Sequence, residues 1–123
     1  MSAPKIQGWC PGALRPMLSG DGLVVRVRPH GGRLTQGQMS GIADLAARHG
    51  NGLIDLSARA NVQIRGVGEA GHAALIDGLG ALDLIDDSLA AETRRNIVVQ
   101  PFWVAGDDTR TVIARLEAAL AAA

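Results

Sequence analysis

Hydrophobic and polar residues alternate in two segments of the chain, which is the pattern of β-strands that bury one face. Residues 23–28 read Leu-Val-Val-Arg-Val-Arg, and residues 61–67 alternate polar with mostly aliphatic side chains. Shorter aliphatic runs predict two more strands, at residues 53–57 and 96–100. The sequence therefore predicts four strands, which can form one sheet.

Other segments repeat apolar residues every three or four positions, as amphipathic helices do. Thr35 and Gln38 have the spacing of a capping box and open the first of these helices, which Gly50 and Gly52 close. The same periodicity predicts a helix over residues 69–82.

After this second helix, residues 83–94 are acidic and then basic, and we expect a loop there. Asp107 and Asp108 can cap a last helix, which runs to Ala123 without a polar stop. Because that helix has no C-cap, we expect it to lead into a further domain.

The element order is β-α-β-β-α-β plus a final helix, which is the ferredoxin-like split β-α-β plan of an α+β two-layer sandwich. It predicts an antiparallel sheet with two helices on one face and with the first and third strands as central neighbours. The expected organisation is a Pro/Gly-rich extension of loops and turns (residues 1–22), a ferredoxin-like domain (23–101), and a linker with the C-terminal helix (102–123).

Strand alternation brings polar residues together on the face of the sheet away from the helices. Arg26, Arg28, Asn61, Gln63 and Arg65 are expected to share that open face. Arginine forms bidentate hydrogen bonds with carboxylates and phosphates, so such a face suits a polycarboxylate or another oxyanion.

Further residues are expected at the rim of this face, and these are Asp55, Ser57 and Arg59. The plain alternative is that this is only the solvated side of a two-layer sandwich. RNA binding is disfavoured, because the central strands contain none of the aromatic residues on which bases stack.

Composition narrows the function further. The 123 residues carry 12 Lys+Arg and 12 Asp+Glu, so a general attraction to nucleic acid or membranes is not expected. No apolar run is long enough to span a bilayer, and a cytoplasmic location is the expectation. The one cysteine, Cys10, excludes an internal disulfide, and it excludes a cysteine zinc site or an iron–sulfur cluster held by this chain alone; the histidines show no metal-site spacing.

Three stretches resemble the nitrite/sulfite reductase ferredoxin-like half domain. Residues 25–35, Val-Arg-Val-Arg-Pro-His-Gly-Gly-Arg-Leu-Thr, are similar to its first strand and turn. Residues 55–66 match the family pattern Thr-x-Arg-x-x-x-Gln, with Ser57 in place of the threonine, and residues 95–97 match the Arg-Asn-Ile/Val of its fourth strand. Within this superfamily, residues 10–12, 16–22 and 59–66 resemble the precorrin-3B synthases.

The resemblance implies a ligand of the tetrapyrrole class, sirohaem or a precorrin, with acetate and propionate groups around its rim. In precorrin-3B synthases, the implied reaction is the hydroxylation of precorrin-3A in aerobic cobalamin biosynthesis by an iron–sulfur monooxygenase. By the same resemblance, Arg26 and Arg95 are the substrate-facing, catalytic arginines, and the tetrapyrrole-binding residues are Arg28, Arg59, Asn61, Gln63 and Arg65.

The chain departs from the family in one respect: the cysteines that hold a [4Fe–4S] cluster in its members are absent. We therefore expect no cofactor on this chain alone and no complete enzyme, but one part of a larger oxidoreductase with its remaining domains or a partner subunit. The alternatives are a half domain of a sirohaem nitrite or sulfite reductase, and a stand-alone, non-catalytic module that binds tetrapyrroles or other anions.

Overall fold

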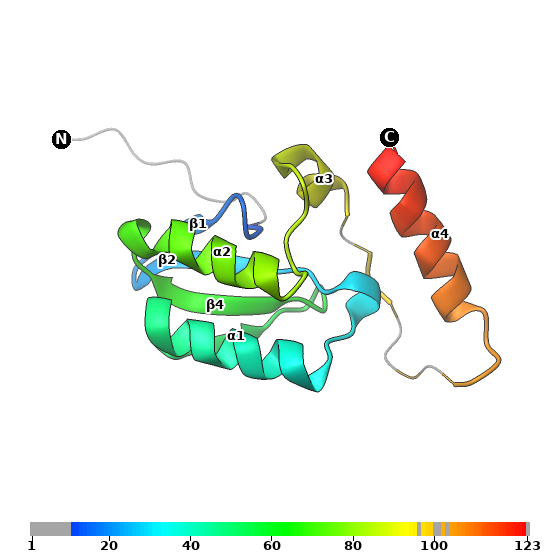
Figure 1. Cartoon of the computed structure of the whole chain (residues 1–123), viewed down its shortest axis with the longest axis horizontal. Coiled ribbons are helices and arrows are strands. Elements are labelled where there is room, and N and C mark those ends of the chain that lie inside the picture. Colours follow the sequence, from blue (N-terminus) through cyan, green and yellow to red (C-terminus); the bar gives the residue numbers. More distant parts are fainter. Residues whose placement is uncertain (1–10, 96, 100–101, 103, 123) are drawn as a thin grey trace.

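The computed structural model of the chain describes residues 11–95, 97–99, 102 and 104–122. It contains a sheet of four antiparallel strands in the order β1-β2-β4-β3 (Figure 1). The strands are β1 (Met17–Ser19), β2 (Gly22–Val27), β3 (Ile54–Leu56) and β4 (Val62–Val67), the helices are α1 (Gln36–His49), α2 (His72–Ala81), α3 (Leu89–Arg94) and α4 (Thr109–Ala122), and the short 3-10 turns are η1 (His30–Gly32) and η2 (Glu69–Gly71).

The central strands are β2 and β4, as the sequence predicts. Val25 lies opposite Ile64 and Val27 opposite Val62, and all four side chains are buried. They form a core with residues of α1 and α2, which lie side by side over one face of the sheet (Figure 1). The helix residues of this core are Ile42, Ala46, Leu75 and Leu79. The ferredoxin-like, α+β architecture is thereby confirmed.

Helix α1 starts and ends where its sequence signals predict. The Thr35 hydroxyl accepts a hydrogen bond from the Gln38 backbone N–H (3.0 Å), and the Gln38 side chain accepts one from the Thr35 N–H (2.9 Å). At the other end, the N–H groups of Gly50 and Gly52 donate to the carbonyl of Ala46. At each end of the helix, a backbone group that lacks a regular helical partner is therefore paired with a neighbouring residue.

The prediction for the fourth strand is wrong. Residues 97–99 are described and none of them is in a strand, while residues 96 and 100 lie outside the described residues. The place beside β2 belongs to β1, in the segment expected to hold only loops and turns. A strand that follows directly across a tight turn pairs with little loop-closure cost, and Gly22, at a φ of 126°, permits that turn.

Two other boundaries differ from the prediction. Residues 83–94 are not all loop, because α3 begins after Ser88, whose hydroxyl accepts a hydrogen bond from the Ala91 N–H (3.1 Å). The helix expected over residues 69–82 is split into η2 and α2. In the described part of the chain, no helix has the length and apolar character needed to cross a membrane.

Candidate functional site: the open face of the sheet

The open face of the sheet is organised around a pair of residues on the two central strands. Arg26 of β2 lies directly opposite Gln63 of β4. The Gln63 side-chain oxygen accepts hydrogen bonds from Nε of Arg26 (3.0 Å) and from Nη2 (2.6 Å). The neighbours Val62 and Ile64 point into the core, so this pair faces away from α1 and α2. The predicted association of Arg26 with Gln63 is thus present.

Arg65 also lies on β4, but carboxylates neutralise it. Its guanidinium is 3.2 Å from an Asp21 oxygen and 3.5 Å from an Asp55 oxygen. The hydrogen bond from Arg65 lowers the pKa of Asp21 below its ordinary value. Asp21 was missed by sequence reasoning, because the hairpin between β1 and β2 that carries it beside Arg65 was not predicted. The face is therefore less cationic than expected.

Arg28 and Asn61 do not join this face, contrary to the prediction, because both side chains are buried. Arg28 follows the last residue of β2, and its guanidinium donates to the backbone carbonyls of Glu92 and Pro11. Its Nε has no hydrogen-bond partner in the part of the chain that the structure describes. The N-terminal segment and α3 cover Arg28, and neither contact could be inferred from strand alternation.

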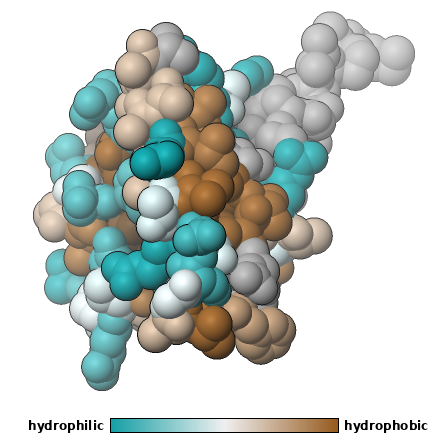
Figure 2. All heavy atoms as spheres, turned by 90° about the vertical axis from the view of Figure 1, so that its right-hand side faces the viewer, coloured by the Kyte–Doolittle hydropathy of each residue, from teal (hydrophilic) through white to brown (hydrophobic). Residues whose placement is uncertain are grey.

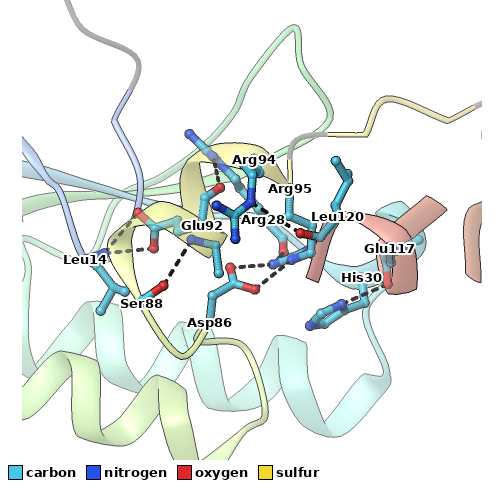
Figure 3. A network of polar contacts seen from close by, with 12 residues as sticks. Leu14, Arg28, His30, Asp86, Ser88, Glu92, Arg94, Arg95, Glu117 and Leu120 are labelled. Atoms are coloured by element: carbon cyan, nitrogen blue, oxygen red, sulfur yellow. Dashed lines mark hydrogen bonds and ion pairs between the residues drawn. The ribbon is translucent and has the colours of Figure 1, made fainter. Parts of the chain in front are cut away.

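Arg95 lies in the same buried region, at the end of α3. Its Nε and Nη2 donate to the two carboxylate oxygens of Asp86 (2.9 and 3.1 Å), and Nη2 also donates to the carbonyl of Arg28 (2.8 Å) (Figure 3). Arg95 is thus paired with Asp86 and the Arg28 carbonyl, whereas Arg26 is paired with Gln63 on the open face. A substrate-facing role for Arg95 stays a prediction, and in this conformation the guanidinium is committed to Asp86.

Glu92 completes the buried network. The backbone N–H of Leu14 donates to both of its carboxylate oxygens, at 3.2 and 2.9 Å (Figure 3). Glu92 thereby joins α3 to the N-terminal segment, 78 residues away in the sequence. Sequence reasoning missed Glu92 and Asp86, since a buried carboxylate on a short helix or in a loop has no distinctive spacing.

Arg59 is the most accessible of the predicted arginines. It lies in the turn between β3 and β4, where Ala60 has a left-handed φ of 59°. The hydroxyl of Ser57 accepts hydrogen bonds from the N–H groups of Arg59 and Asn61 (both 3.3 Å). This turn holds the Arg59 backbone while its side chain stays in solvent. An exposed guanidinium on a constrained turn is well suited to meet a carboxylate.

Metal-binding groups are not gathered at this face. Among the described residues, no cluster of three or more His, Cys, Asp or Glu could hold a metal ion. Cys10 lies outside the described residues. The open face thus presents the Arg26–Gln63 pair, and the exposed Arg59 lies in the turn between β3 and β4.

The comparisons with known proteins agree with the sequence motifs. Residues 15–82 match the model of the family described as "Nitrite/Sulfite reductase ferredoxin-like half domain". Over 115 residues, or 93% of its length, the chain is 37% identical to a protein named precorrin-3B synthase from Sinorhizobium sp. It spans about a quarter (25%) of that relative's length. No solved structure gives a significant match.

Proposed function

Because this chain belongs to the nitrite/sulfite reductase ferredoxin-like half-domain family, we propose that it is the tetrapyrrole-binding half domain of a precorrin-3B synthase-like oxidoreductase. In this proposal its substrate is a precorrin, and the complete enzyme hydroxylates precorrin-3A. The identity to the Sinorhizobium protein, over nearly the whole chain, supports a precorrin ligand. The alternative, a half domain that holds sirohaem in a nitrite or sulfite reductase, is supported by the family description alone.

The observation that carries the proposal is the Arg26–Gln63 pair on the open face. An arginine side chain loses rotamer entropy when it binds a ligand, and a prior hydrogen bond reduces that loss. Gln63 holds the guanidinium of Arg26 in one orientation before any ligand arrives. A carboxylate at the rim of a tetrapyrrole is the kind of group that such a preorganised guanidinium binds.

The iron–sulfur chemistry of such an enzyme does not fit the residues of this chain. A [4Fe–4S] cluster is held by several cysteine thiolates, and the sequence contains one cysteine. In our proposal the chain therefore supplies binding and orientation of the tetrapyrrole, and no electron-transfer step is assigned to it. The cluster would come from another domain or a partner subunit.

An apolar surface supports the proposal of such a partner. A groove of about 390 Å³ runs between residues 97–99 and α4, and Val98, Val112 and Leu116 are exposed there. Figure 2, which faces the α4 side of the molecule, shows hydrophobic side chains gathered on this side. Exposed apolar patches of this kind mark contacts with other protein surfaces.

The test is a titration of the full chain with uroporphyrin III, a stable porphyrin whose rim carries only carboxylate side chains. Removing a charge-assisted hydrogen bond costs about 1–3 kcal/mol, so Arg26→Ala and Arg59→Ala should each raise Kd by roughly 5- to 150-fold. Arg48→Ala is the matched control, because Arg48 pairs with Asp44 on the exposed side of α1. If the Kd for uroporphyrin III is unchanged in both test variants, the proposed binding site is wrong and the open face is an ordinary solvated surface.

A further inference from the structure

A second groove, separate from the open face, lies between η1 and α4. It has a volume of about 470 Å³, and its polar lining consists of His30, Gly31, Arg33, Arg110 and Glu117. A carboxylate already fills part of it. Glu117 of α4 accepts a hydrogen bond from the Gly31 N–H (2.9 Å) with one oxygen and contacts Nδ1 of His30 (3.0 Å) with the other (Figure 3).

The η1 turn is shaped to bind an oxygen anion. Gly31 and Gly32 have left-handed φ angles of 65° and 68°, a conformation that leaves the Gly31 N–H outside regular pairing and directed at Glu117. A carboxylate only accepts hydrogen bonds, so Nδ1 of His30 donates to Glu117 in the tautomer that carries its proton there. The two donors together hold both oxygens of one carboxylate, and Arg110 adds positive charge to the same groove.

The carboxylate of Glu117 is attached to a helix with a small apolar contact area. Ile113 is buried, but Val112 and Leu116 of α4 are exposed. A further tie is the hydrogen bond from Nε of Arg94 to the carbonyl of Leu120 (3.2 Å). Figure 1 shows α4 set apart from the layer formed by α1 and α2. The contacts of α4 with the rest of the domain therefore include polar contacts made by Glu117 and Leu120 beside the buried Ile113.

We infer that the η1 turn is a binding site for a carboxylate of a small-molecule ligand, and that Glu117 is a tethered carboxylate that occupies this site until the ligand displaces it. The groove is many times larger than the ~30 Å³ share of one water, which leaves room for the body of the ligand beside its carboxylate. The η1 site uses no residue of the open face, so a test of this inference is independent of a test of the proposed tetrapyrrole site.

Chemical rescue in the full chain tests the inference, with propionate as the probe. In Glu117→Ala, the Gly31 amide proton should move upfield in the NMR spectrum, because it loses its acceptor, and millimolar propionate should return it downfield. Sodium chloride at equal ionic strength should not. In the double variant Glu117→Ala/His30→Ala, Kd for propionate should rise about tenfold, the effect of one lost hydrogen bond.

The wild-type chain should bind propionate more weakly than Glu117→Ala, since its own carboxylate competes. Asp44→Ala is the matched control, because it removes an exposed carboxylate that pairs with Arg48 on α1, away from the groove. The inference is overturned if the Gly31 resonance is the same in Glu117→Ala and wild type, or if propionate shifts it equally in the double variant. Equal propionate affinity in wild type and Glu117→Ala would refute the tethered role of Glu117.

Discussion

Of the ion pairs in the described structure, Asp86–Arg95 is the one whose removal should lower the free energy of unfolding most. Its side chains are 12% and 9% exposed, and both carboxylate oxygens are used. Removing one partner of a buried pair costs about 3–5 kcal/mol, because a charge stays buried without compensation. Arg95 would still donate to the carbonyl of Arg28, so we expect Asp86→Ala to lower the free energy of unfolding by about 3 kcal/mol.

Urea denaturation followed by circular dichroism measures this change. The matched control is Asp44→Ala, which removes an ion pair whose members are 58% and 67% exposed and should cost less than about 1 kcal/mol. The double variant Asp86→Leu/Arg95→Met removes both charges together. It should be more stable than Asp86→Ala, because no unpaired charge is left inside.

One result would refute this reasoning. If Asp86→Ala were no more destabilising than Asp44→Ala, the Asp86–Arg95 pair would behave in solution like a surface contact. If the same variant also bound uroporphyrin more tightly, Arg95 would be a ligand-facing group that Asp86 restrains, which is the role that the sequence motif implies for it. A loss of stability without a gain in affinity supports a structural Arg95.

Two further predictions concern the N-terminal segment and the start of α4. A Cβ at Gly12 would lie 1.8 Å from Oε1 of Glu92, so Gly12→Ala must displace that carboxylate from the Leu14 N–H. We expect this variant to lower the free energy of unfolding, measured by urea denaturation, by about 2–3 kcal/mol. Gly20→Ala is the control and should change stability little, because its Cβ meets nothing within 4 Å. Hydrogen bonds from the backbone N–H groups of Val104 and then Thr109 lower the pKa of Asp107 below its ordinary 3.8. The stabilising effect of the Asp107 carboxylate is therefore complete above that pH and is lost as the pH falls through the lowered pKa. Asp107→Asn keeps a capping oxygen but does not titrate, and its stability should therefore fall less between pH 4 and more acidic conditions than that of wild type; equal acid sensitivity would contradict this cause.

The sequence alone identified the parts of the fold that depend on neighbouring residues. The capping box of Thr35 and Gln38 needs only a helix turn to form, and Gly50 ends that helix locally. The alternation in residues 23–28 and 61–67 needs only the two-residue period of a strand to separate buried valines and isoleucine from Arg26 and Gln63. These signals were therefore sufficient to predict the central strand pair and the face that carries the Arg26–Gln63 contact.

The tertiary structure decided which segment occupies the edge of β2 and which arginines are buried, because both depend on contacts between distant segments. The strand predicted at residues 96–100 is not present in the described residues 97–99, whereas residues 17–19, expected to be loop, are joined to β2 by a tight turn and pair with its edge. The burial of Arg28 and Arg95 follows from contacts with Pro11, Asp86 and Glu92, which come from separate parts of the chain. The alternation of polar and apolar residues predicts to which side of a strand an arginine side chain points, but not which segment covers that side chain. For that reason the sequence predicted which arginines could bind an anion, and only the packed structure separated the exposed Arg59 and the half-buried Arg26 from the buried Arg28 and Arg95.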